Sequence, residues 1–221
     1  KEINTKLEIL NDEFQRVHKY NPIEHIKARI KSPESIVKKL KKYGYESTVS
    51  NMVKYINDIA GIRVICSFTS DIYQIAEMIA KQYDIKIISI KDYIESPKPS
   101  GYKSFHMLVT VPIFLSDRMI DAKVEIQIRT VAMDFWASLE HKMNYKFEGH
   151  APQAIKEELV ECAKMVSDLD DRMLSLNEEI NRFANTQIGM EELLEDRPKS
   201  DGKSCALPNN GTSLSEKRAV Q

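Results

Sequence analysis

The segment Lys123-Val-Glu-Ile-Gln-Ile-Arg129 alternates strictly between apolar and polar residues. Because successive side chains of a β-strand point to opposite faces, the pattern predicts a strand with a buried apolar row and with Glu125, Gln127 and Arg129 together on the other face. A carboxylate, an amide and a guanidinium in line on a core strand are costly unless each has a partner. The row therefore indicates a polar site as well as a strand.

Upstream of this strand, the apolar and β-branched segment 107–112 predicts the other strand of a hairpin. The hairpin is preceded by Ser100-Gly-Tyr-Lys-Ser-Phe-His106, and residues 95–101 are rich in proline and glycine, which predicts a surface loop. The ring of Tyr102 has basic neighbours in the sequence: Lys98, Lys103 and His106. A ring for stacking and cations for phosphate, near a carboxylate strand, indicate a nucleotide site.

The remaining apolar periodicity predicts helices and strands in alternation. Helices are expected over 3–17, 33–44, 47–56, 71–83 and 130–146 and from 152 onward. Apolar strands are expected over 62–67 and 85–90, and a short strand or extended segment, partly alternating with basic residues, over 24–31. The order strand, helix, strand over 62–90 is typical of a crossover connection, so part of the sheet is expected to be parallel. The fold class is therefore α/β (α+β mixed), a mixed β-sheet flanked by helices.

Segment 27–42 holds seven basic residues and one acidic residue. Ser32 is expected to cap the helix that begins at Pro33. A basic strand that leads into a helix N-terminus attracts anions, because backbone N–H groups and side-chain charges converge there. The alternative is a solvated, lysine-rich helix face.

Two carboxylates stand out from the pattern: Asp58 at the entrance of a strand and Glu125 within one. Such a pair can hold Mg²⁺ and can orient or deprotonate an attacking hydroxyl. Taken singly, each has a simpler explanation: a salt bridge from Glu125 to Arg63 or Arg129, and a turn cap for Asp58. Together with Tyr102 and the basic segment, a catalytic site is favoured.

The bulk composition narrows the class of protein. The 221 residues carry a net charge of −1, so the whole surface is not committed electrostatically to nucleic acid. No apolar run approaches the ~20 residues that span a bilayer, and no signal peptide is evident, so no membrane partner is expected. The three cysteines are far apart in the sequence, which favours reduced thiols and a cytoplasmic location. The chain begins at Lys1 rather than Met, so we expect residues before it.

Apolar residues recur at spacings of four and three along both terminal helices. Over 155–183 the repeat lasts about four heptads, more than a small sheet can cover, which indicates pairing of the two helices with each other or with a second chain. We therefore expect an oligomerisation helix over 1–20, a catalytic domain over 21–150, a long oligomerisation helix over 151–185, and a tail over 186–221 whose polar composition is typical of disorder.

Five motifs occur in a fixed order, and together they carry a resemblance to a known family. They are Arg29-Ile-Lys-Ser-Pro-Glu-Ser35, Asp58-Ile-Ala-Gly-Ile-Arg63, Gly101-Tyr-Lys-Ser-Phe-His106, Val124-Glu-Ile-Gln-Ile-Arg129 and Phe135-Trp-Ala-Ser-Leu-Glu-His141. They resemble the synthetase domain of the RelA/SpoT-homologue family. With no hydrolase domain before them and no regulatory domain after them, the chain resembles a stand-alone small alarmone synthetase.

That resemblance implies a nucleotidyltransferase-like fold, a homotetramer built with the terminal helices, and Mg²⁺ as cofactor. It also implies transfer of pyrophosphate from ATP to the 3′-hydroxyl of GTP or GDP, which gives AMP and the alarmones pppGpp or ppGpp of the stringent response. Asp58 and Glu125 would be the catalytic and metal-binding residues, with Glu125 activating the hydroxyl.

The resemblance also assigns the substrate contacts. For ATP, Arg29 and Arg63 would sandwich the adenine. Four further residues would hold the phosphates: Lys31, Ser35, Lys39 and Lys42. For the guanine nucleotide, Tyr102 would stack on the base, and cations would contact phosphates: Lys91, Lys98 and His106. Gln127 and Asp134 would place the guanosine, and the Asp134 carboxylate would accept from guanine N1–H and N2–H.

Two other functions remain open at this point. One is a nucleotidyltransferase that adds a nucleoside monophosphate, although such enzymes usually have an Asp-x-Asp metal pair and Asp58-Ile-Ala60 offers a single carboxylate. The other is a non-enzymatic binder of nucleotide or single-stranded RNA that uses the basic segment and Tyr102. A binder has no need for Asp58 and Glu125 together.

Overall fold

The computed structural model of the protein describes residues 1–18, 20–146 and 151–195, and the chain divides into two compact units, 1–179 and 180–221. The first unit holds α1 (Glu2–Val17), β1 (Ile23–Ile30), α2 (Pro33–Lys42), α3 (Val49–Tyr55), β2 (Ala60–Cys66), α4 (Thr69–Ala80), β3 (Lys86–Asp92), β4 (Phe105–Phe114), β5 (Met119–Thr130), α5 (Val131–Lys146) and most of α6 (Gln153–Glu195). In the second unit, the described residues form the end of α6.

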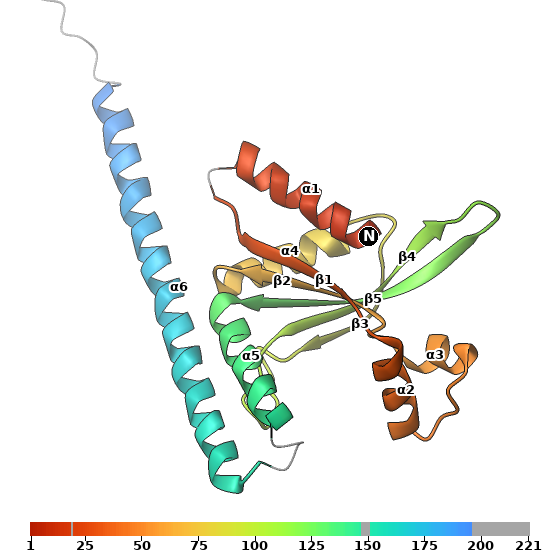
Figure 1. Cartoon of the computed structure of the whole chain (residues 1–221). Helices are drawn as coiled ribbons and strands as arrows, with labels where there is room; N and C mark the ends of the chain where they lie inside the picture. The colour runs from red at the N-terminus through yellow and green to blue at the C-terminus, as the bar shows by residue number, and fades with distance from the viewer. Residues whose placement is uncertain (19, 147–150, 196–221) are drawn as a thin grey trace, which may run out of the picture. The chain divides into compact units, whose positions relative to one another are not determined.

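The five strands form one mixed sheet in the order β1-β2-β5-β4-β3 (Figure 1). Strands β2 and β5 are parallel, whereas the other three neighbouring pairs are antiparallel. The expected mixed sheet and the β4–β5 hairpin are thus confirmed. The crossover through α4 does not make β3 a neighbour of β2, because it carries the chain to the opposite edge of the sheet.

Helices α1 and α4 cover one face of the sheet (Figure 1) and bury its apolar rows. The seam residues Ile3, Leu7 and Phe14 of α1 belong to the same core cluster as Val64 of β2 and Ile126 of β5. The four-three spacing predicts that this seam pairs with another helix or with a second chain. That expectation was wrong, because the seam is covered by the chain's own sheet.

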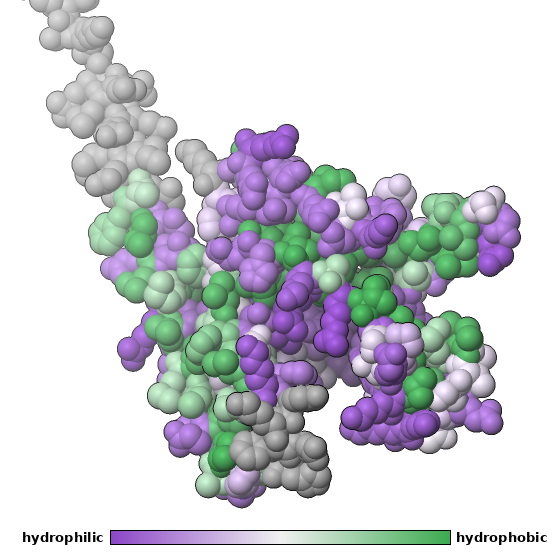
Figure 2. Space-filling view, in the orientation of Figure 1, coloured by the Kyte–Doolittle hydropathy of each residue, from purple (hydrophilic) through white to green (hydrophobic). Residues whose placement is uncertain are grey.

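Strand β3, expected as an apolar strand over 85–90, lies at an edge of the sheet. Its isoleucines Ile87, Ile88 and Ile90 are exposed, as is usual for one face of an edge strand. Hydrophobic residues are also exposed at the end of the β4–β5 hairpin (Figure 2), where Phe114 and Met119 lie.

Helices α2 and α3 have a small hydrophobic cluster of their own, formed by Ile36, Leu40 and Ile56. As expected, Ser32 caps α2: its hydroxyl accepts a hydrogen bond from the backbone N–H of Ser35, and Pro33 begins the helix. The cap fixes the point at which the basic strand β1 leads into α2.

Within the first unit, α6 packs on α5 and on the end of β5. The indole Nε1 of Trp136 donates to the carbonyl of Leu159, and the hydroxyl of Thr130 donates to the buried carboxyl of Asp170 over 2.6 Å. Helix α6 continues to Glu195, past the expected boundary at 185. The remainder of the expected tail, 196–221, lies outside the described residues.

Candidate active site

A row of polar side chains crosses all five strands on one face of the sheet. The strand register aligns Lys27 with Arg63, Arg63 with Gln127, Gln127 with His106, and His106 with Lys91. Residues paired in this way point to the same side of a sheet. Segments far apart in the sequence therefore contribute to one polar surface, on the face opposite α1 and α4.

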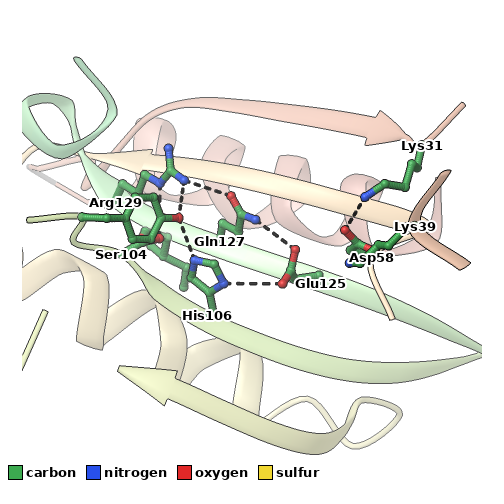
Figure 3. A network of polar contacts seen from close by, with 10 residues as sticks. Lys31, Lys39, Asp58, Ser104, His106, Glu125, Gln127 and Arg129 are labelled. Atoms are coloured by element: carbon green, nitrogen blue, oxygen red, sulfur yellow. Dashed lines mark hydrogen bonds and ion pairs between the residues drawn. The ribbon is translucent and has the colours of Figure 1, made fainter. Parts of the chain in front are cut away.

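The polar side chains of β5 share one face, as the alternation predicted, and they form hydrogen bonds with one another and with residues on neighbouring elements. The amide of Gln127 donates to Glu125 Oε2 over 2.9 Å and accepts from Arg129 over 3.2 Å (Figure 3). Glu125 does not form the salt bridge to Arg63 or Arg129 that the simpler explanation required of it; in the described part of the chain its ionic partner is His106. The carboxylate is thus placed by an amide and an imidazole.

Arg129 is the centre of this network, although its side chain is only 5 % exposed. Its guanidinium donates to the hydroxyls of Ser104 and Tyr102, and it forms an ion pair of 3.0 Å with Asp134 at the start of α5. A buried guanidinium is tolerated when its donors are satisfied in this way. The sequence predicts Arg129 in the polar row and offers it only as a possible partner of Glu125. Only the fold brings Ser104, Tyr102 and Asp134 around it.

His106 connects Tyr102 to Glu125. Its Nε2 lies 2.9 Å from the Tyr102 hydroxyl, and its Nδ1 lies 3.4 Å from Glu125 Oε1 (Figure 3). The contact with His106 is the largest influence on the pKa of Glu125 and lowers it; burial acts in the opposite direction, and Gln127 helps His106. Glu125 is therefore held as a carboxylate.

Asp58 forms a second charged cluster with the basic segment. Lys31 and Lys39 both bind its carboxylate, Lys39 over 2.9 Å (Figure 3). Burial alone would raise the pKa of Asp58, but the two lysines outweigh it and lower the pKa. Asp58 is therefore also ionised. A residue that only capped a turn would not need two lysines as partners, so the turn-cap explanation is insufficient.

Both carboxylates line one pocket of about 300 Å³. Its other lining residues come from β1, β2, β5 and the link that follows β1: Lys27, Arg29, Lys31, Gly61, Ile62, Arg63 and Gln127. The described residues contain no group of three or more acidic, histidine or cysteine side chains that could hold a metal on their own. Two carboxylates in a pocket lined by lysine and arginine nevertheless suit Mg²⁺, which commonly takes one or two protein carboxylates and completes its shell with water and substrate phosphates.

The loop between β3 and β4 brings further expected residues to the network. The ammonium of Lys98 lies 4.6 Å from the ring centre of Tyr102, and the guanidinium carbon of Arg129 lies 5.0 Å from the same centre. Tyr93, which we did not select, contacts this group edge-on through Tyr102 and His106. A base that stacks on the face covered by Lys98 has to displace that side chain.

Asp134 is engaged differently from the sequence expectation. Its Oδ1 accepts from both Arg63 and Arg129, each over 3.0 Å. A contact of both carboxylate oxygens with guanine therefore requires release of the arginines. Arg63 also keeps a buried Nε without a partner among the described residues, and its pKa is lowered by burial and by Arg129.

The remaining expected residues lie at the margins of this site. Ser35 is half-buried at the first turn of α2, where its hydroxyl accepts from Ser32. Lys42 is exposed at the last turn of α2, and Lys91 is exposed on the edge strand β3. The structure thus brings Asp58 and Glu125 into one pocket with Arg29, Lys31 and Arg63, and it places Tyr102 and His106 beside Glu125.

Comparison with known proteins assigns the family. Residues 28–150 match the family model described as a region found in RelA / SpoT proteins. The chain belongs to this family. GTP pyrophosphokinase YwaC of Bacillus subtilis is 47 % identical over 179 residues, which cover 81 % of this chain and 85 % of the relative. GTP pyrophosphokinase YjbM of the same organism is 33 % identical over 195 residues, covering 86 % of this chain and 91 % of the relative.

Solved structures of this RelA/SpoT family have the same fold. Small alarmone synthetase 2 from Bacillus subtilis superposes with a TM-score of 0.73 at 45 % identity, covering 80 % of this chain and 91 % of that chain. Small alarmone synthetase 1 from the same organism, bound to its product pppGpp, gives a TM-score of 0.77 at 33 % identity, covering 81 % and 91 %. The expected mixed, nucleotidyltransferase-like fold is confirmed.

Proposed function

We propose that this protein is a small alarmone synthetase that transfers pyrophosphate from ATP to the 3′-hydroxyl of GTP or GDP, giving AMP and pppGpp or ppGpp. The observation that carries the proposal is the pocket in which Asp58 and Glu125 lie together beside a row of cations. The 47 % identity to a GTP pyrophosphokinase supports it independently.

The donor half of the site is the basic segment with Asp58. Arg29 and Arg63 line the pocket from neighbouring strands, a position suited to holding adenine by cation–π stacking. Lys31 and Lys39, now paired with Asp58, would turn to the ATP phosphates, with Ser35 and Lys42 further along α2. Because phosphate replaces the carboxylate as the partner of both lysines, Asp58 becomes free to bind a cation.

The acceptor half is the β3–β4 loop with the start of β4. Tyr102 would stack on guanine, and the cations around it would contact the phosphates: Lys91, Lys98 and His106. Gln127 and Asp134 would place the guanosine. The contact of Lys98 with the Tyr102 ring supports the phosphate role of Lys98, because a base that stacks on the ring displaces this ammonium and leaves it close to the nucleotide.

Glu125 lies between the two halves and acts as the base. As a half-buried carboxylate held ionised by His106 and Gln127, it can accept the proton of the 3′-hydroxyl while that oxygen attacks the β-phosphorus of ATP. Mg²⁺ held by Asp58 and Glu125 would neutralise the charge that develops on the transferred phosphates. Lys31, Lys39 and the arginines hold the donor in line with the attacking oxygen.

Incubation of the protein with ATP, GTP and Mg²⁺, followed by chromatography, tests the proposal. AMP together with a more highly phosphorylated guanosine is the expected result. Release of pyrophosphate would indicate nucleotidyl transfer, and no turnover would indicate a non-enzymatic binder.

We also propose a catalytic domain over 21–150, supported by the family match to 28–150, followed by an oligomerisation helix over 151–185 and a tail over 186–221. Helix α1, within the expected unit 1–20, packs on the sheet of the catalytic domain. A homotetramer assembled through α6 is supported by exposed apolar residues along that helix: Met165, Leu169, Met173 and Leu176. Measurement of mass in solution, with and without product, tests it. No helix of the described residues is long and apolar enough to cross a bilayer. Cys66 and Cys162 are free thiols, which supports our proposal of a cytoplasmic enzyme.

A further inference from the structure

Helix α6 lies directly behind the loop that carries Tyr102. Residues 101–104 lead into β4 without regular secondary structure, and their side chains contact two different parts of the molecule. Tyr102 and Ser104 face Arg129, whereas Lys103 faces α6, where its ammonium donates to the hydroxyl of Ser167. The same short segment therefore presents one side to the nucleotide site and the other to α6.

Gly101 is fitted to this contact in two ways. Its φ of +85° lies in the left-handed region that glycine adopts readily, and a Cβ atom added there would overlap the Cβ of Ala163. The turn before it is closed by a hydrogen bond from the Gly101 N–H to the carbonyl of Lys98. A small residue on α6 and a glycine on the loop thus set how closely the two approach.

The contact has little free space. The cavity between the loop, α5 and α6 has a volume of only about 20 Å³ and is lined by Gly101, Lys103, Ala163 and Ser167 among others. That volume is close to the minimum for a single water molecule. On its other side the contact borders a groove of about 330 Å³ that the same four residues help to line. A larger side chain at position 163 therefore pushes against the loop at Gly101 unless it turns into this groove.

Helix α6 also contacts the end of β5, next to Arg129, which is the other residue of the Tyr102–Arg129 contact. The buried carboxylate of Asp170 accepts from Thr130, which directly follows Arg129 and whose hydroxyl accepts from the backbone N–H of Met133 in the first turn of α5. One face of α6 is thus attached on one side to the Tyr102 loop and on the other to the end of β5. These two attachments lie on either side of the Tyr102–Arg129 contact and together fix its position.

We propose that Ala163 and Ser167 of α6 are positioning residues for the guanine-nucleotide half of the site, acting through Gly101 and Lys103 to fix the place of Tyr102. The proposal rests on the proposed function for the identity of the nucleotide. It predicts that α6 controls capture of the acceptor and leaves capture of ATP unchanged, because the ATP half is built on β1, α2 and β2.

The test compares Ala163→Leu and Ser167→Ala with matched controls on the same helix, Ala154→Leu and Ser175→Ala, whose positions are exposed. We expect KM for GTP to rise roughly tenfold in Ala163→Leu, since displacements of the order of 1 Å disturb a site strongly. A smaller rise is expected in Ser167→Ala, and Ser167→Thr, which keeps the hydroxyl, should restore the wild-type value. KM for ATP should stay within about twofold throughout, and the controls should match the wild type.

Binding of a fluorescent GTP analogue, measured on the same variants without ATP, separates this inference from the proposed function. If the wild-type protein shows no turnover, the proposed function is overturned. The affinities of the variants for the GTP analogue would still decide the role of α6. Unchanged GTP affinity in both variants would overturn the inference, as would equal weakening of GTP and ATP. Circular dichroism on heating identifies a variant that fails to fold, in which case Ser167→Ala, the smaller change, decides.

Discussion

The imidazole Nδ1 of His106 lies 3.4 Å from Oε1 of Glu125, and this contact is the main reason that the pKa of Glu125 is lowered. The two residues sit on neighbouring strands and are aligned by the β4–β5 register through Gln127. A carboxylate that must take a proton from a hydroxyl is useful only when it is ionised. The register of a hairpin thus sets the acid–base state of the residue that we propose as the base.

Replacing His106 is expected to shift the pH dependence of turnover. In His106→Leu the largest influence lowering the pKa of Glu125 is lost and burial, which raises it, remains. The acid limb of the profile of kcat against pH should therefore move to higher pH. Since the folded pKa of Glu125 is lowered, its ionisation stabilises the wild type above the unfolded pKa, and this stabilisation is lost as pH falls through the folded value.

That profile is measured at saturating GTP, because His106 is also proposed to contact phosphate. His25→Leu, on the exposed side of β1, is the matched control and should leave the profile unchanged. An acid limb that stays in place in His106→Leu would show that another group governs it.

Tyr102→Ala should weaken the use of GTP selectively. Stacking of a base on an aromatic ring contributes about 1–3 kcal/mol, so KM for GTP should rise roughly 5- to 150-fold while KM for ATP changes little. Tyr102→Phe keeps the ring and removes only the hydroxyl contacts with Arg129 and His106, so its effect should be smaller. Equal effects of Tyr102→Ala on the two substrates would refute the stacking role.

Asp58→Asn should alter the dependence of the rate on Mg²⁺. The change removes one of two metal-binding carboxylates, so we expect a loss of roughly a hundredfold in kcat and a higher Mg²⁺ requirement. Initial rates over a Mg²⁺ titration measure both. Asp117→Asn, in the exposed turn of the hairpin, is the control. An unchanged Mg²⁺ profile would remove Asp58 from the metal site.

Arg129→Met should destabilise the fold. It leaves Asp134 with a single arginine and removes a partner from Ser104 and Tyr102, so the free energy of unfolding should fall by about 3 kcal/mol. Urea denaturation measures the change, and Arg118→Met at the hairpin turn should stay within about 0.5 kcal/mol of the wild type. Arg129→Lys keeps the charge without the forked geometry and should lie between. A loss in Arg129→Met no larger than in Arg118→Met would contradict the central position of Arg129.

The sequence was sufficient for the parts of the site that depend on strand period. Strict alternation over 123–129 predicted that Glu125, Gln127 and Arg129 share a face, and the hydrogen bonds of Gln127 to both neighbours confirm it. The cap at Ser32 was equally readable, because the Ser-Pro pair is a local signal.

Features set by long-range packing were not readable. The isoleucines of β3 have the composition of a buried strand, but the position of β3 at the edge leaves them exposed. The seam of α1 has the period of a coiled coil and yet packs on a sheet. Both Arg63 and Arg129 reach Asp134, a contact that depends on how α5 leaves β5 and that no spacing predicts.

The central claim is that the β- and γ-phosphates of ATP move together to a guanine nucleotide. ATP labelled in either the α- or the γ-phosphate, incubated with GTP and Mg²⁺, tests it most directly. We predict the γ-label in a guanosine product more highly phosphorylated than GTP and the α-label in AMP, with neither product formed by Glu125→Gln, which should still bind both nucleotides. The α-label in a larger product together with free pyrophosphate, or near-normal turnover by Glu125→Gln, would contradict the account.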